Sequence, residues 1–345
     1  TIVKEVSKMA NETFVIDMQK HYIPREALKL ARKTREYDYT VGLRRFTKAY
    51  EIITNIDEHL RWMDDSEIHM AILSTAAFSA NGYQFCKVCN DGYSKVIKKH
   101  PNRFKGMIHV YPYDKGKNED EIKRGVEELG LWGIGVVSSY QKMTIDSPIM
   151  DPIYEMAIQY DMPIYVHPTI RNKLWGGERY DLYMTITREY DIAKSFVEMI
   201  YGVLPRFPDL KVIFAHFGGG LPVLKGRLLA WHQPKDFPLP KEDRGHGLAV
   251  DQAKELGLVD DFDSKLKKIY FDSAGFGGWL PVIKSAFETL GADHICFGTD
   301  YPYEFREPKY VKKIIHDINQ IDVPRKDKEK FFSGNLKKLY RIEEG

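Results

Sequence analysis

The chain contains the apolar run Val212-Ile213-Phe214-Ala215, which is followed by His216-Phe217-Gly218-Gly219-Gly220. Two further runs, Ile164-Tyr165-Val166-His167-Pro168 and Ile295-Cys296-Phe297-Gly298-Thr299-Asp300, also end in an ionisable residue. Each predicts a buried strand with a polar side chain at its carboxyl end. In a parallel barrel these ends open onto one face, where active sites are built. Two imidazoles and a carboxylate on that face can bind a divalent metal and move protons.

Short runs of this β type, rich in Val, Ile, Tyr and Phe, punctuate the whole chain. Most are continuous rather than alternating, which is typical of strands buried on both faces. Helical patterns separate them. The expected strands are 14–17, 70–74, 106–110, 134–138, 163–166, 211–215, 268–272 and 294–298. The clearest expected helices are 82–99, 118–130, 148–160, 189–204, 279–291 and 307–318.

This alternation favours a distorted (β/α)8 TIM barrel, with residues 1–345 forming a single domain. The alternative is an open doubly wound sheet, which would carry phosphate-binding glycines after its first strand. No such motif follows Asp17. Three segments, 18–68, 171–188 and 233–266, exceed normal loop length, and we expect them to follow strands as insertions on the catalytic face.

The composition is that of an ordinary globular protein, with 43% hydrophobic and 29% charged residues. A net charge of +2 gives no reason to expect nucleic acid or an anionic membrane as a partner. We find no apolar stretch long enough to span a bilayer, and residues 1–12 lack the apolar core of a signal peptide. Three cysteines cannot form a disulfide framework. We therefore expect a reduced, cytoplasmic protein that acts on a small molecule.

The first predicted strand is followed by Gln19-Lys20-His21. Alternate residues on an extended chain point the same way, so the side chains of Gln19 and His21 can face one ion. Glutamine offers only a neutral carbonyl oxygen, which is a weaker donor to zinc than an imidazole. Gln19 is therefore either a ligand or a hydrogen-bond partner of a ligand. His21 is expected to contact the metal or the substrate.

The strand-end residues also have structural interpretations. His167 alone would often be a satisfied polar group, and His216 with its glycines could simply start a tight turn into a helix near Pro222. Asp300 could bind metal, carry a proton or cap a helix. Three such residues at matching strand ends favour the functional interpretation.

Several longer motifs resemble the aminocarboxymuconate-semialdehyde decarboxylase branch of the amidohydrolase superfamily. They are Asp17–Pro24, Met70–Thr75, Arg206–Lys211, Ala215–Pro222 and Phe297–Pro302, and the similarity extends from about residue 14 to Asn335. The resemblance implies a distorted barrel with one divalent metal, zinc before manganese. It implies metal ligands at Gln19, His21, His167 and Asp300, His216 as the catalytic base, and a homodimer. The branch has histidine or glutamate where this chain has Gln19.

Three further residues are candidates for binding the substrate. Arg227 matches a basic position in the resembled branch, and Arg45 lies in the first long insertion. Either guanidinium could pair with a carboxylate in two parallel hydrogen bonds. Tyr301 could line an aromatic pocket, although packing in the core is the default for such a ring.

The leading hypothesis is a metal-dependent, non-oxidative decarboxylase, a carbon–carbon lyase, of a small aromatic or conjugated carboxylic acid. Loss of carbon dioxide leaves a carbanion-like centre, to which Asp300 or His216 would give a proton. The alternative is a metal-dependent hydrolase of a lactone or cyclic amide, in which the same ligands would hold a metal hydroxide. A barrel that only binds its ligand is a third hypothesis, and the neutral Gln19 is its sole support.

Overall fold

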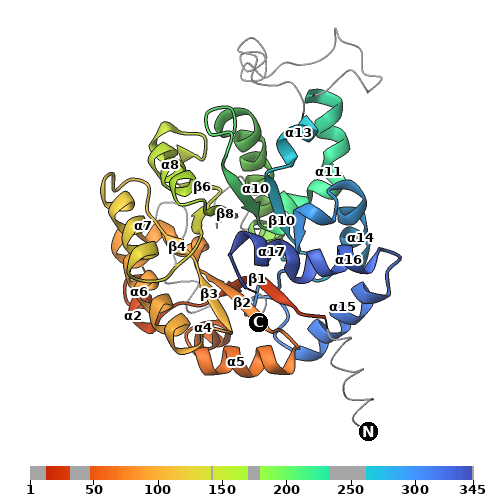
Figure 1. Ribbon diagram of the computed structural model, residues 1–345, viewed down its shortest axis with the longest axis horizontal. Coiled ribbons are helices and arrows are strands. Elements are labelled where there is room, and N and C mark those ends of the chain that lie inside the picture. The colour runs from red at the N-terminus through yellow and green to blue at the C-terminus, as the bar shows by residue number, and fades with distance from the viewer. Residues whose placement is uncertain (1–12, 32–46, 141–142, 170–178, 233–261, 344–345) are drawn as a thin grey trace.

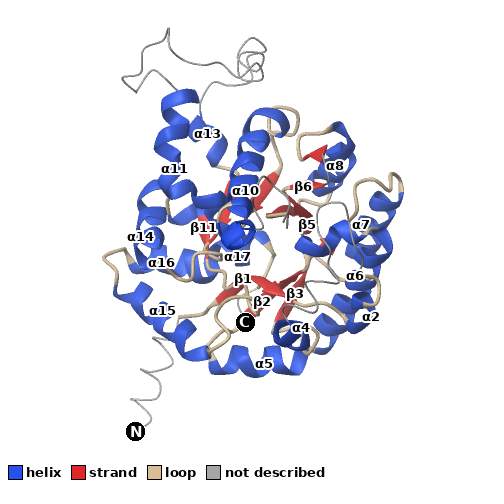
Figure 2. Ribbon diagram, turned by 180° about the vertical axis from the view of Figure 1, so that it is seen from behind, coloured by secondary structure: helices blue, strands red, loops and turns tan. Residues whose placement is uncertain are grey.

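Short parallel strands lie at the centre of this computed structural model, and helices surround them (Figure 1). The structure describes residues 13–31, 47–140, 143–169, 179–232 and 262–343. Helices cover the strands from behind as well (Figure 2). The parallel strands are β1 (Ile16–His21), β2 (Met70–Ser74), β3 (Phe104–Gly106), β4 (Ile108–His109), β5 (Ile134–Val137), β8 (Pro163–His167), β9 (Lys211–Phe214), β10 (Ile269–Asp272) and β11 (Ile295–Cys296). An antiparallel pair, β6 (Ser139–Tyr140) and β7 (Met143–Thr144), follows β5.

The parallel strands form two sheets, with the orders β1-β2-β3 and β11-β10-β9-β8-β5-β4. One junction between the sheets is Met107, which alone separates β3 from β4. The backbone N–H of Met107 donates to the carbonyl of Leu73 at 3.1 Å, and that of Ile108 donates to Gly133 at 2.8 Å. The segment therefore pairs with β2 first and with β5 next, which joins the two sheets.

The second junction lies where β1 meets the chain after β11. The backbone N–H of Met18 donates to the carbonyl of Phe297 at 2.9 Å, and that of His21 donates to Tyr301 at 2.9 Å. With both junctions hydrogen-bonded, the sheets close into a distorted barrel, which confirms the predicted (β/α)8 architecture.

The helices lie outside the barrel (Figures 1 and 2). They are α2 (Arg25–Leu28), α4 (Thr47–Ile53), α5 (Ile56–Asp65), α6 (Tyr83–Lys99), α7 (Lys117–Glu127), α8 (Asp151–Gln159), α9 (Leu182–Thr185), α10 (Thr187–Glu198), α11 (His216–His232), α13 (Phe262–Leu266), α14 (Leu280–Thr289), α15 (Pro308–Gln320), α16 (Arg325–Glu329) and α17 (Asn335–Leu339). Short 3-10 or π turns are η1 (Ala76–Asn81), η2 (Pro148–Met150), η3 (Arg179–Asp181), η4 (Met199–Val203), η7 (Ala292–His294) and η8 (Lys330–Gly334).

The expected long insertions contain more regular structure than predicted. Segment 18–68 extends β1 to His21 and includes α2, α4 and α5. Helix α5 is capped by Asn55, whose side chain accepts a hydrogen bond from the backbone of Glu58, a signal that was present in the sequence. Segment 171–188 contains η3, α9 and the start of α10. Segment 233–266 begins after α11 rather than after a strand, and its residues 233–261 lie outside the described residues.

The core forms where predicted, between the barrel and the helices. All five residues of β8 are buried because β5 and β9 pair with it on both sides. Ile192 and Phe196 of α10 are buried at the helical spacing that the sequence shows. All three cysteines are buried and unpaired. In the described part of the chain, none of the helices combines the length and apolar character needed to cross a membrane.

Candidate metal centre

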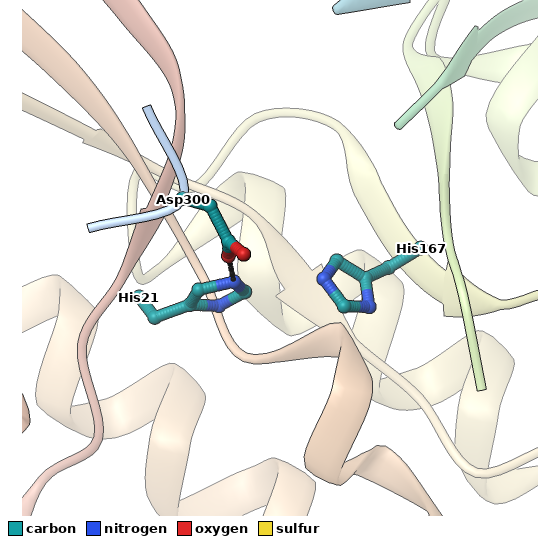
Figure 3. A group of neighbouring side chains, drawn as sticks. All are labelled: His21, His167 and Asp300. Carbon is teal, nitrogen blue, oxygen red and sulfur yellow. Dashed lines mark hydrogen bonds and ion pairs between the residues drawn. The ribbon is translucent and has the colours of Figure 1, made fainter. Parts of the chain in front are cut away.

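Three buried side chains from distant parts of the chain converge at the carboxyl ends of the strands. His21 ends β1, His167 ends β8, and Asp300 follows β11 (Figure 3). Their candidate ligand atoms all lie within 4.8 Å of one another. Each residue is almost completely buried, with 1%, 1% and 3% of its surface exposed. This arrangement brings the predicted strand-end residues together on one face of the barrel.

Both histidines are oriented by backbone carbonyl groups. Nδ1 of His21 lies 3.1 Å from the carbonyl oxygen of Ser74, and Nδ1 of His167 lies 2.9 Å from that of Pro168. A carbonyl can only accept, so Nδ1 carries the proton in both rings. The Nε2 lone pairs of His21 and His167 then point into the cluster. This is the usual support for a histidine that binds a metal.

The shortest contact in the cluster joins Nε2 of His21 to Oδ1 of Asp300, at 2.7 Å (Figure 3). When Nδ1 of His21 holds the ring's only proton, both of these atoms are acceptors. Two buried acceptors at this distance need a positive centre, either a second proton on His21 or a metal ion beside both atoms. The donor set of two imidazoles and one carboxylate fits a divalent metal.

The side-chain amide of Gln19 lies at the middle of this cluster. Its Nε2 is 2.9 Å from Oδ1 of Asp300, 3.3 Å from Nε2 of His167 and 3.3 Å from Nε2 of His216. Nε2 of His21 is 3.5 Å away. Gln19 is fully buried. Four polar side chains therefore aim at one point, and the amide N–H groups of Gln19 occupy it.

Tyr165 holds the other end of the Gln19 amide. The phenol oxygen of Tyr165 lies 2.8 Å from Oε1 of Gln19 and 3.0 Å from Oδ2 of Asp272. A phenol has one proton, so it can donate to only one of these two acceptors. Turning the amide by half a rotation places Nε2 at Tyr165 and Oε1 in the cluster. Tyr165 then accepts from Gln19 and donates to Asp272, and Oε1 of Gln19 joins the other acceptors of the cluster.

His216 joins the same cluster from the start of α11 and forms a pair with Glu189 of α10. Nδ1 of His216 lies 2.8 Å from Oε1 of Glu189, while its Nε2 faces Gln19. Burial by itself would lower the pKa of His216, but the carboxylate of Glu189 raises it to about 9. In Asp300, burial opposes ionisation, yet the hydrogen bond with His21 holds the pKa of its carboxyl well below the usual range. Asp300 is thus an ionised acceptor and His216 can hold a proton.

The glycines after His216 allow α10 and α11 to approach each other. His216 itself and all residues to Gly220 have positive φ, so the right-handed part of α11 starts after them. A Cβ on Gly219 would lie 2.2 Å from the carbonyl oxygen of Glu189. A Cβ on Gly275 would lie 2.4 Å from the ring of His216. These glycines therefore let the His216 ring and Glu189 meet, as expected from the glycine run.

Two buried aspartates fix the loops that carry the cluster. Asp17 accepts hydrogen bonds from the backbone and hydroxyl of Thr299, at 2.9 and 2.6 Å, and from the backbone of Gln19 at 3.2 Å. Oδ1 of Asp272 accepts from the backbone N–H of His216 at 3.1 Å. Asp272 thereby fixes the backbone of His216 rather than its ring.

The structure brings Tyr303, rather than the predicted Tyr301, to the cluster. The ring of Tyr303 lies 5.5 Å from that of His21. The ring of Tyr301 stacks 3.9 Å from that of Trp62 and lies 4.0 Å below Nζ of Lys20. Side chains alternate along β1, so Lys20 and its partner Tyr301 lie on the side away from His21.

The two predicted arginines are not among the cluster's contacts. Arg227 lies on the exposed part of α11, beside an apolar pocket between α10 and α11. It is eleven residues beyond His216 in the sequence, and the contacts found among the described residues of the cluster do not include it. Arg45 lies outside the described residues.

The sequence analysis missed Glu189, Tyr165 and Glu304. Glu189 starts a helix, and Tyr165 lies inside an apolar strand, so neither interrupts a pattern. Glu304 follows Asp300 by four residues, and its backbone N–H donates to the Asp300 carbonyl at 3.1 Å. Burial and the Asp300 charge raise the pKa of Glu304 to about 7. Its proximity to Asp300 in the sequence was the available signal.

Replacing Gly219 with alanine tests the approach of α10 to His216. The new Cβ would meet the Glu189 carbonyl, and the positive φ of 74° would be strained. We expect Gly219→Ala to lower the free energy of unfolding by about 2 kcal/mol or more. Gly226→Ala, in the same helix with nothing within 4 Å, is the control. It should leave stability unchanged or raise it by up to about 1 kcal/mol in urea unfolding. Equal stability of the two variants would contradict this account of the glycine run.

The barrel and its site can be compared with known proteins. The sequence of a 2-amino-3-carboxymuconate-6-semialdehyde decarboxylase from Dictyostelium discoideum is 24% identical over 262 residues, covering 73% of this chain and 67% of that protein. A gamma-resorcylate decarboxylase from Polaromonas is 25% identical over 315 residues, covering 83% and 87%.

Solved structures share the fold over nearly the entire length. A 5-carboxyvanillate decarboxylase from Sphingomonas paucimobilis has a TM-score of 0.79 and 20% identity, covering 96% of this chain and 100% of the other. One from Novosphingobium aromaticivorans, complexed with manganese and a nitrobenzoic acid, has a TM-score of 0.80 and 23% identity, covering 95% and 96%. The sequence pattern described as amidohydrolase matches residues 16–342, and this chain therefore belongs to the amidohydrolase family.

Proposed function

We propose that the chain is a metal-dependent, non-oxidative decarboxylase of a small aromatic or conjugated carboxylic acid. The observation that carries this proposal is the convergence of His21, His167, Asp300 and His216 on one buried point at the mouth of the barrel. The similar sequences and structures named above are decarboxylases of such acids. A site that combines ligands for a cation with a separate proton-carrying histidine suits this reaction.

In this proposal His21, His167 and Asp300 hold a single divalent metal. The metal would act as a Lewis acid that binds the substrate's carboxylate or a neighbouring hydroxyl and keeps the reacting carbon in place. Two nitrogen ligands and a carboxylate suit both zinc and manganese, with imidazole favouring zinc and oxygen favouring manganese. Manganese is the metal in the similar structure from Novosphingobium. Elemental analysis of protein purified without added metal identifies the ion.

Gln19 completes the ligand set in its turned orientation. Its Oε1 then faces the cluster, and its Nε2 donates to Tyr165, whose own proton goes to Asp272. A bound metal ion would favour this orientation of the amide. In the other orientation the N–H groups of Gln19 would point at a positive charge.

His216 carries the proton in the proposed reaction. Its Nε2 faces the point where the metal ligands meet, and its Nδ1 is held by Glu189, which stabilises the charged imidazolium. After carbon dioxide leaves, the carbanion-like carbon takes the proton from Nε2 of His216. Asp300 would stay ionised as a ligand, so it has no proton to give. Burial of the whole cluster excludes water and strengthens these electrostatic interactions.

We also propose a cytoplasmic homodimer. Exposed apolar side chains lie between α9 and α10, on α10 and on α11: Ile186, Tyr190 and Val223 are 61%, 59% and 74% exposed. Apolar surface of this kind is typical of subunit contacts. We expect sedimentation equilibrium to give twice the mass of 40.1 kDa, and a monomer at micromolar concentration would contradict the dimer.

Gln19→Glu tests whether Gln19 binds the metal. Glutamate keeps the length of the side chain, accepts the Tyr165 proton and adds a negative charge at the cluster. If position 19 is a ligand, the variant should bind zinc and manganese about tenfold more tightly or better. The affinity is measured by competition with a coloured chelator. Gln320→Glu, at the exposed end of α15, is the matched control. Unchanged affinity in Gln19→Glu would remove Gln19 from the ligand set.

Release of carbon dioxide from hydroxybenzoic acids tests the function, and two variants separate the roles of the site residues. We expect His216→Ala to keep its metal and to lose at least about two orders of magnitude in turnover, the scale of lost proton transfer. Asp300→Asn should lose its metal, and its turnover should also fall by at least about two orders of magnitude.

His316→Ala and Asp322→Asn, both exposed, are the controls and should retain wild-type rates. Near-normal turnover in His216→Ala or Asp300→Asn would refute the assigned roles. If the protein releases an acid from lactones and releases no carbon dioxide, it is a hydrolase rather than a decarboxylase.

A further inference from the structure

The first turn of α10 contains three consecutive polar side chains with unused hydrogen-bonding atoms. Oγ1 of Thr187, Nε of Arg188 and Oε2 of Glu189 are buried, and none of them has a hydrogen-bond partner among the described residues. Buried polar atoms in proteins are almost always paired. A run of three unpaired atoms in adjacent residues is therefore unusual, and it requires an explanation such as a bound ligand, ion or water.

Arg188 is the most informative of the three. Its side chain is 93% buried, since only 7% of the residue is exposed. A guanidinium cannot lose its charge and offers five N–H donors. The contact found for it is a weak one, from an Nη atom to Sδ of Met184 at 3.9 Å. Described residues thus give this buried cation no carboxylate and no carbonyl, although burying an unpaired charge is strongly unfavourable.

The position of Arg188 places its charge at the candidate metal centre. The next residue, Glu189, is the one that contacts His216. Arg188 precedes Glu189 in the same first turn of α10 and is itself buried. Its charge therefore lies in the helix that borders the cluster at His216.

The charge of Arg188 points to an anionic partner. Glu189 is engaged with His216, and no carboxylate among the described residues is hydrogen-bonded to Arg188. A neutral ligand would leave this buried cation unpaired.

We propose that Arg188 is a specificity-determining residue that binds an anionic oxygen group of the substrate by charge-assisted hydrogen bonds. The substrate class is therefore an acid that is still ionised when bound, and its neutral amide is rejected. This inference rests on the proposed function, because it assumes that the acid substrate enters the same site. Arginine suits this role better than lysine because its planar group matches a carboxylate with two parallel N–H donors.

The test compares 2-hydroxybenzoate with 2-hydroxybenzamide, which have nearly the same shape and differ in charge. Isothermal titration calorimetry measures binding of each probe to the metal-loaded wild-type protein and to Arg188→Gln. We expect the wild type to prefer the acid by at least about tenfold, and Arg188→Gln to bind the acid about 10- to 100-fold more weakly, as for a lost hydrogen bond to a charged group. Binding of the amide should change by less than about threefold, the scale of a minor perturbation.

Arg188→Lys is a second variant in case the glutamine variant does not fold. It keeps the charge but loses the planar pair of donors, so it should retain amide binding and lose part of the preference for the acid. Arg61→Gln is the control, because Arg61 is exposed and paired with Glu58 on α5. It should bind both probes as the wild type does, and circular dichroism melting checks that all variants are folded.

A purely structural role for Arg188 would weaken binding of the acid and the amide equally, and that result would overturn the proposal. Acid binding that is unchanged in Arg188→Gln, or a wild type that binds both probes equally or neither, would overturn it as well. The decarboxylase proposal fails on a different measurement, the absence of carbon dioxide release. If the decarboxylase proposal fails, the binding result for Arg188 still stands.

Discussion

Buried lone pairs that meet at one point, without a positive charge of their own, are the constraint on which the site depends. Nε2 of His21 and Oδ1 of Asp300 approach to 2.7 Å, and Nε2 of His167 lies beside them. Carbonyl groups fix the proton of each histidine on Nδ1, so the rings cannot turn their lone pairs away. Only protons or a metal ion can make this arrangement stable in a dry interior. The hydrogen bonds that close the barrel at β1 therefore also bring together the acceptor atoms that need a cation.

Strained backbone conformations occur at the same place. His216, Phe217 and Asp300 all have positive φ, a conformation that residues with a Cβ seldom adopt. Surrounding contacts enforce it: Asp272 binds the backbone of His216, and Asp17 binds the loop before Asp300. Those two buried carboxylates therefore hold the loops that carry His216 and Asp300. The aspartates inside the barrel thus contribute to the site through geometry, although neither belongs to the proposed ligand set.

The sequence predicted the parts of this structure that follow a repeating pattern. His167 and Asp300 could be located because each follows an apolar run, and strand ends of a barrel share a face. Glu189 could not, because its partner His216 is 27 residues away and only the strained turn after β9 brings the two together. The sequence predicted Tyr301 at the cluster, and the structure has Tyr303 there, for a similar reason. The side of β1 on which each ring lies depends on the bridge between Lys20 and Tyr301 that closes the barrel. Periodicity says which residues are buried, whereas contacts across helices require coordinates.

In the proposed site, Gln19 would link metal binding to the choice of substrate. An ionised residue at this position would cancel one positive charge of a bound cation, and the neutral amide would not. The protein would then hold the cation less tightly, and the cation would attract an anionic substrate more strongly. The proposed role of Arg188 has the same direction, since no described carboxylate is hydrogen-bonded to its buried charge. Both proposals therefore lead to one physical idea: the acid substrate would supply part of the negative charge that this site needs.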